Sequence, residues 1–248
     1  MLKSYYDKSG QESDRYMTLS GIAAHDGVWA EIESAWDGIL KNRVPAAAYM
    51  HMVEAAGLRG EFSLAKGWDQ TKVDLLLSDL LVYLTTLDKG TYRQFSVTVN
   101  MTDYRMLQSK TYQMDSPADL CIQGCVDRIM AWYLFKYQGL DLEASFFFDR
   151  NEPFEPIFKV KWEKETQRDK DTGGYSIWSH IVDIGSACKE KTHGIQIADM
   201  LAWGNNRQIC GYEKFAHIAT VMKSLIGTET IVWDEKKLRE RFRPLVWI

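Results

Sequence analysis

The sequence predicts an α/β protein whose mixed sheet carries helices on both faces and has an antiparallel edge at the N-terminus. Two observations predict this class. Segments with apolar residues at alternate positions recur along the chain between segments whose apolar residues follow a helical spacing. Two strand-like segments, joined only by a polar loop, also open the chain as a hairpin-like unit. No linker, repeat or low-complexity tract interrupts this pattern, so we expect a single domain over residues 1–248.

In the first half of the chain, helical and alternating patterns follow one another in short order. The helical pattern is clearest where Ile32 and Trp36 share one face, and the alternating pattern is clearest at Phe95, Val97 and Val99. The expected strands are 3–7, 16–24, 46–52 and 94–101. The expected helices are 28–40 and 72–87.

The second half continues the alternation. Ser116 and Pro117 suit the cap and first turn of a helix that runs through Tyr133. The expected strands are 142–148 and 178–184. Further helices are expected over 156–165 and from Gly194. We expect a polar loop over 169–174, and a helical and then irregular segment over 212–248.

Composition restricts the function classes. A chain of 248 residues with 46% hydrophobic content can bury a sizeable core. Its net charge of −4 does not indicate a general nucleic-acid binder, so any such contact must use a local patch. No membrane-length apolar run or signal peptide is visible, and we expect no membrane association and a cytoplasmic location. The cysteines are expected to be buried free thiols: Cys121, Cys125, Cys188 and Cys210.

The candidate functional residues are carboxylates near the ends of predicted elements. Asp199 lies inside the apolar helical run 194–203, where a carboxylate needs a partner or a function. Asp7 ends the first strand, Glu54 follows the predicted strand 46–52, and Asp149 ends the strand 142–148. Functional groups gather beyond the carboxyl ends of strands in α/β sheets. Converging carboxylates repel one another unless a divalent cation neutralises them, and oxygen ligands suit Mg²⁺ or Mn²⁺.

Each acid also has an ordinary structural interpretation. Asp7 would be a turn former before Gly10, and Asp149 would form a surface ion pair with Arg150. Glu54 would be a solvated acid or a helix cap. The acids that compete for these roles are Glu61, Asp69 and Asp103.

The two ends of the chain carry motifs that resemble a known family. The segments are Tyr-Tyr-Asp-Lys-Ser-Gly at 5–10 and Gly-Ile-Gln-Ile-Ala-Asp at 194–199. They resemble the opening and closing motifs of the family called domain of unknown function 3800, which is assigned to the ribonuclease H-like superfamily. Between these motifs the family has a Glu after an early strand and an Asp closing a later one, which Glu54 and Asp149 match best. The resemblance implies a ribonuclease H-like fold for the domain.

The chain departs from the family pattern at two positions. Lys8 stands where the family usually has Glu, and Arg150 follows Asp149 where an acid is common. Both changes place positive charge beside the expected site. Such charge would bind a phosphate, or would replace a metal charge in a protein that does no catalysis.

The leading hypothesis is a metal-dependent nuclease in which Asp7, Glu54, Asp149 and Asp199 hold Mg²⁺ or Mn²⁺ and phosphodiester bonds are hydrolysed. The rival is an inactive ribonuclease H-like domain that binds a protein or nucleic-acid partner. Under either hypothesis, the residues expected to support the acids are Lys8, Ser9, His193 and Gln196. His193 would shuttle protons or make a partly buried hydrogen bond, and Gln196 would orient an acid or cap its helix.

Overall fold

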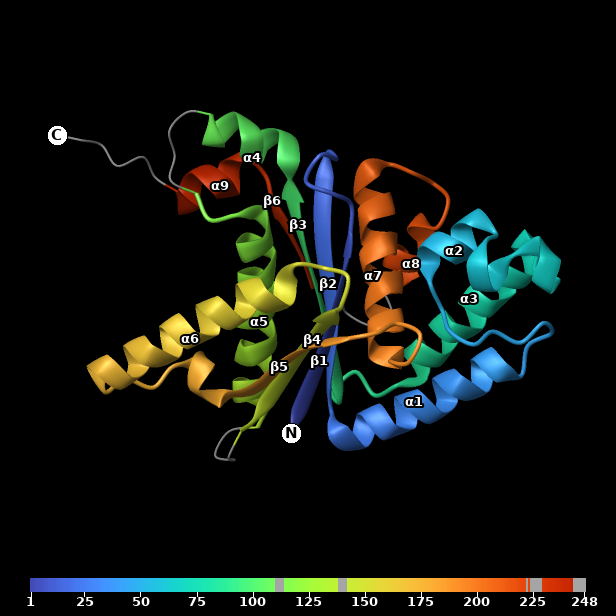
Figure 1. The fold of residues 1–248 in the computed structure, drawn as a ribbon, viewed down its shortest axis with the longest axis horizontal. Helices are drawn as coiled ribbons and strands as arrows, with labels where there is room; N and C mark the ends of the chain where they lie inside the picture. Colours follow the sequence, from blue (N-terminus) through green and yellow to red (C-terminus); the bar gives the residue numbers. More distant parts are fainter. Residues whose placement is uncertain (110–113, 138–141, 222, 224–228, 243–248) are drawn as a thin grey trace.

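A computed structural model shows a six-stranded mixed sheet with helices on both faces (Figure 1). The structure describes residues 1–109, 114–137, 142–221, 223 and 229–242. The strand order across the sheet is β5-β4-β1-β2-β3-β6. The strands are β1 (Leu2–Ser9), β2 (Tyr16–His25), β3 (Tyr92–Asn100), β4 (Ala144–Asp149), β5 (Ile181–Ala187) and β6 (Glu229–Trp233).

The N-terminal strands pair antiparallel, as the hairpin-like sequence pattern predicts. β2 lies between β1 and β3 and is antiparallel to both. These strands occupy the interior of the sheet, so the expected antiparallel edge is wrong in its position. The reason is that β4 returns to the free side of β1 and β6 to the free side of β3, each in parallel orientation. The edges of the sheet are therefore β5 and β6.

The helices divide between the two faces of the sheet (Figure 1). One face carries α5 (Pro117–Lys136) and α6 (Phe154–Thr172). The other carries α7 (His193–Cys210), with α1 (Asp26–Lys41) and α3 (Gln70–Thr86) packed beyond it. The shorter helices are α2 (Met52–Gly57), α4 (Met101–Gln108), α8 (Ala216–Val221), α9 (Glu235–Arg241) and the single 3-10 turns η1 (Gly60–Phe62), η2 (Leu64–Lys66) and η3 (Ile177–His180). The backbone N–H of Asp119 donates to Ser116 Oγ at 3.1 Å, which confirms the predicted cap of α5.

Each face of the sheet has its own apolar core because side chains alternate along β1. Tyr6 stacks on Phe148 with ring centroids 5.2 Å apart on the α5 face. Tyr5 contacts Trp29 of α1 edge-to-face at 4.7 Å on the α7 face. By the same alternation, the Asp7 side chain lies on the α7 face and the Lys8 side chain lies on the α5 face.

Three local predictions are wrong, and the strand expected over 178–184 is confirmed only from Ile181, where β5 begins after η3. Residues 46–52 form no strand, because the backbone N–H groups of Met50 and Met52 donate to side chains of α7 instead of to a ladder. The polar segment 169–174 begins within α6, which continues to Thr172 and ends at Gly173 with φ +63°. The tail expected to be helical and then irregular contains the strand β6; residues 222, 224–228 and 243–248 lie outside the described part.

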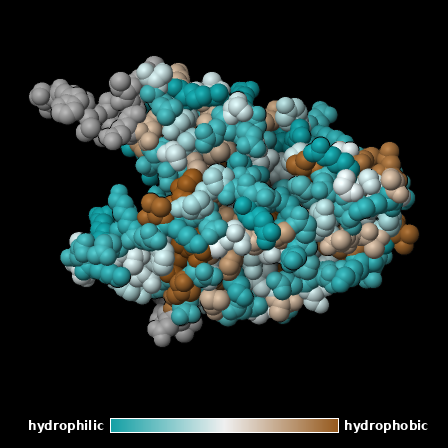
Figure 2. Space-filling model, viewed as in Figure 1, coloured by the Kyte–Doolittle hydropathy of each residue, from teal (hydrophilic) through white to brown (hydrophobic). Residues whose placement is uncertain are grey.

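All four cysteines are free thiols, as expected, although only Cys121 and Cys125 are fully buried. In the described part of the chain, no helix combines the length and apolarity that crossing a membrane requires. Figure 2 shows a face that is mainly hydrophilic, with apolar side chains in small patches.

The close approach of α7 to β1 depends on a glycine. A Cβ at Gly194 would collide with the ring of Tyr5. We expect Gly194→Ala to destabilise the protein by about 1–3 kcal/mol through overpacking. Gly38→Ala in α1 is the matched control, because a Cβ there would have no heavy atom within 4 Å, and it should stabilise by up to about 1 kcal/mol. Urea unfolding measures both, and equal shifts would contradict the close packing.

Candidate functional site

Three aspartates from distant segments meet under α7. β1 and β4 are parallel neighbours with Tyr6 paired to Phe148, which places Asp7 and Asp149 side by side at the same end of the two strands. α7 packs against β1 and β2, and Asp199 lies in its buried portion. The three residues are 3%, 2% and 4% exposed. The predicted convergence of these three acids is therefore present.

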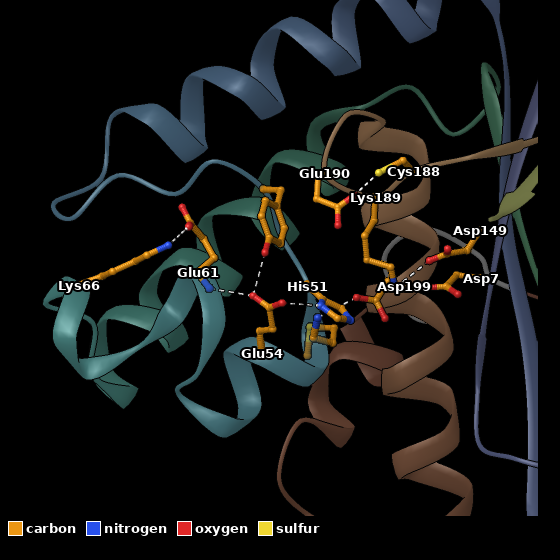
Figure 3. Close-up of polar contacts among 12 residues, drawn as sticks. Asp7, His51, Glu54, Glu61, Lys66, Asp149, Cys188, Lys189, Glu190 and Asp199 are labelled. Carbon is orange, nitrogen blue, oxygen red and sulfur yellow. Dashed lines mark hydrogen bonds and ion pairs between the residues drawn. The ribbon is translucent and has the colours of Figure 1, made fainter. Parts of the chain in front are cut away.

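The ammonium of Lys189 lies among these carboxylates (Figure 3). Its Nζ is 3.2 Å from Asp7 Oδ2 and 2.9 Å from Asp149 Oδ2. Lys189 belongs to the turn between β5 and α7, where the backbone N–H of Lys191 donates to the carbonyl of Cys188 at 3.0 Å. The site thus contains its own positive charge.

Burial and mutual repulsion shape the charge of this cluster. Burial raises the pKa of Asp7 well above its ordinary value, and Asp199 and Asp149 raise it further, while Lys189 opposes them. Burial alone would lower the pKa of Lys189, but the attraction of Asp199, Asp7 and Asp149 raises it. One ammonium faces three carboxylates, so the fully ionised cluster keeps an excess of negative charge.

Backbone amides hold one oxygen of each carboxylate. The N–H of Lys8 donates to Asp7 Oδ1 at 2.7 Å, and the N–H of Asn151 donates to Asp149 Oδ1 at 3.0 Å. The N–H of Met52 donates to Asp199 Oδ2 at 2.7 Å. The Oδ2 atoms of the first two acids are the ones that meet Lys189.

Gln196 connects the helix to the segments that surround the site. Its Oε1 accepts from Trp36 Nε1 at 2.8 Å and from the backbone N–H of Met50 at 3.0 Å, and its Nε2 donates to the Lys189 carbonyl at 2.8 Å. Gln196 is fully buried. It neither caps its own helix nor contacts an acid in these bonds; it positions the backbone of Lys189.

Glu54 lies in a second polar cluster beside the aspartates. Its carboxylate accepts from Tyr49 Oη at 3.0 Å and from the backbone N–H of Glu61 at 2.8 Å, and it lies 3.3 Å from His51 Nδ1. Figure 3 shows His51 between Glu54 and Asp199. Burial opposes ionisation of Glu54, but these hydrogen bonds outweigh it and lower its pKa. The structure therefore places Glu54 next to the aspartate cluster and not within it.

Lys8 points to the opposite face of β1, where its Nζ lies 2.7 Å from Glu152 Oε2. The positive charge expected from Lys8 is therefore not directed at the aspartates, because side chains alternate along a strand. Ser9 contributes its backbone carbonyl to Asn206 Nδ2 at 3.3 Å.

The remaining predicted residues make no contact with the three aspartates among the hydrogen bonds and ion pairs of the described residues. His193 faces α1: burial lowers its pKa, and Asp37 and Glu33 of that helix act against this shift. Arg150 is exposed, and Asp149 pairs with Lys189 instead of with it. Asp103 Oδ2 accepts from the backbone N–H of Glu235 at 3.0 Å, so it serves α9.

Sequence reasoning missed Lys189. It lies in a polar run with Glu190 and Lys191, a pattern typical of a solvated loop. Its position just before the apolar helix of Asp199 is the only local signal, and Lys191 shares that signal. The identification of Lys189 depended on β1 and β4 lying beside this turn.

The site contains buried carboxylates and one buried ammonium, that of Lys189. Within the described ranges, no three His, Cys, Asp or Glu side chains are already grouped to hold a metal ion. At the aspartate cluster, the position between Asp7 and Asp149 is taken by the Lys189 ammonium. The donor set still fits a divalent cation, since oxygen ligands with excess negative charge suit Mg²⁺ or Mn²⁺.

No protein-family model matches this chain, and no curated protein matches it either.

The hydrogen bonds of Gln196 predict a specific loss of stability. Gln196→Leu leaves the backbone N–H of Met50 and the indole N–H of Trp36 without their acceptor. We expect a loss of about 2–4 kcal/mol, because each buried donor left unpaired costs about 1–3 kcal/mol. Gln208→Leu, an exposed position of the same helix, is the control and should change stability by less than about 0.5 kcal/mol. Urea unfolding at pH 7 separates the two.

Glu54 predicts a pH-dependent contribution to stability. Its pKa is lowered in the folded protein from 4.5, so the unfolded chain binds more protons in that range and stability rises with pH there. Glu54→Gln should therefore lose about 1–2 kcal/mol at pH 7. This deficit should shrink as the pH falls below 4.5 and through the folded pKa. A deficit that stays constant from pH 7 down through this range, in unfolding measured at each pH, would contradict the assignment.

Proposed function

We propose that this chain is a ribonuclease H-like domain that hydrolyses phosphodiester bonds of nucleic acid with Mg²⁺ or Mn²⁺. The observation that carries the proposal is the convergence of Asp7, Asp149 and Asp199, which are buried and come from β1, β4 and α7. The mixed sheet with antiparallel N-terminal strands and helices on both faces is consistent with that fold. The motifs at 5–10 and 194–199 that suggested the family supply two of the three acids.

The three aspartates would hold the cation. Glu54 would lie outside these ligands, in contact with His51, which lies between Glu54 and Asp199. Bound Mg²⁺ or Mn²⁺ supplies activation of water and stabilisation of the leaving oxygen in phosphodiester cleavage. The backbone N–H groups of Lys8, Asn151 and Met52 hold the carboxylates in place. Such preorganisation holds each carboxylate in one orientation before a cation binds.

Nucleic acid is the favoured substrate class because exposed cations flank the acids despite the net charge of −4. Arg150 and Lys191 are both exposed. Their loops are joined where the backbone N–H of Arg150 donates to the Ala187 carbonyl at 3.0 Å. Cations of this kind neutralise backbone phosphates.

The alternative is an inactive domain of the same fold that binds a protein or nucleic-acid partner. The observation that favours it is the ion pairing of Lys189 with Asp7 and Asp149. If the ammonium remained there, the cluster would be a structural ion-pair network.

The proposal predicts metal-dependent cleavage that requires Asp149. We expect the purified protein to cut labelled DNA or RNA with Mn²⁺ or Mg²⁺ and to lose the activity with EDTA. Asp149→Asn should lower the rate by about a hundredfold or more, because a ligand oxygen loses its charge.

Asp103→Asn is the matched control, since Asp103 also follows a strand but accepts a structural hydrogen bond from the backbone N–H of Glu235, the first residue of α9. It should leave the rate within about twofold of wild type. Equal cleavage by wild type and Asp149→Asn would assign the activity to a contaminant. Absence of both cleavage and Mn²⁺ binding would favour the alternative.

A further inference from the structure

Lys189 is the cation in contact with the aspartate cluster in the described part of the chain. Its side chain is only 13% exposed, and its Nζ forms ion pairs with Asp7 of β1 and Asp149 of β4. Removing one partner of a buried ion pair leaves uncompensated charge, so the ammonium stabilises the cluster as it stands.

We infer that Lys189 is a built-in, displaceable counter-cation that regulates metal entry to this site. It neutralises the aspartates when no divalent cation is bound and leaves them when one binds. The inference rests on the proposed function, because it concerns the same site. Lys189 would thereby set the affinity of the site for a divalent cation.

The oxygen atoms make the two cations mutually exclusive. Oδ1 of Asp7 and Oδ1 of Asp149 already accept backbone N–H groups. The Oδ2 atoms, which would serve a metal ion, are those that Lys189 contacts at 3.2 and 2.9 Å. Mg²⁺ requires oxygen at about 2.0–2.1 Å, so it would occupy the region of the ammonium and repel it.

The chain allows the ammonium to leave without unfolding the turn. The Lys189 backbone is held by Gln196 at its carbonyl, and the turn is closed by the Lys191 to Cys188 hydrogen bond. The lysine side chain has a flexible four-carbon stem. Rotation of that stem therefore moves the charge, while the backbone stays in place.

Mn²⁺ titration tests the inference with the whole protein. Lys189→Met keeps the length of the stem and removes its charge. It should bind Mn²⁺ about tenfold or more tightly than wild type, the usual range for coupled binding events. Lys3→Met is the matched control, because Lys3 lies at the other end of β1 with its Nζ 2.9 Å from Asp26 Oδ1. It should bind Mn²⁺ as wild type does, and Asp149→Asn should abolish binding in the Lys189→Met background.

The outcomes separate this inference from the proposed function. Unchanged or weaker Mn²⁺ binding by Lys189→Met, with wild type still binding through Asp149, would overturn the inference and leave the nuclease proposal standing. Tight binding by the variant alone would support the inference. Absence of binding in both proteins would overturn the metal-dependent function and the inference with it.

Lysine labelling of the wild-type protein provides a second test that does not depend on the variant folding. Reductive methylation followed by peptide mass spectrometry should show Lys189 reacting severalfold faster with Mn²⁺ than without it. Lys8 in the same sample should react equally in both conditions. A Lys189 rate that does not rise at saturating Mn²⁺ would contradict displacement.

Discussion

The neutralisation of three buried carboxylates is the constraint on which the rest of the structure depends. α7 can pack on β1 and β2 only if Asp7, Asp149 and Asp199 are compensated, because burying isolated charge is very costly. Compensation comes from one ammonium and one backbone N–H for each acid. Losing one partner of a buried pair costs about 3–5 kcal/mol, a large part of a domain's stability.

The same contacts build the site and join distant parts of the fold. Met50 and Met52 donate backbone N–H groups to Gln196 and Asp199, so α7 organises the segment that leads into α2. That segment then presents His51 and Glu54 beside the aspartates. Asp199 and the second polar cluster are therefore connected through the short segment from His51 to Glu54.

A site of this kind sets stability against function. Burial and the repulsion of Asp199 and Asp149 raise the pKa of Asp7, and the Lys189 ammonium opposes this rise in part. The negative charge that Lys189 does not neutralise is the feature on which the proposed binding of a divalent cation depends. Active sites commonly combine local destabilisation with supporting structure elsewhere.

The elements recognised in the sequence are those whose signal is local. Periodicity predicted the strand and helix patterns of β1 to β3 and of α5, and an acid within an apolar run singled out Asp199. Tertiary structure alone decided three features: the interior position of β1, the nonstrand course of 46–52, and the role of Lys189. Lys189 pairs with Asp7 across 182 residues. Local patterns record which side chains an element buries, whereas the partner of a buried charge is chosen by how distant elements meet.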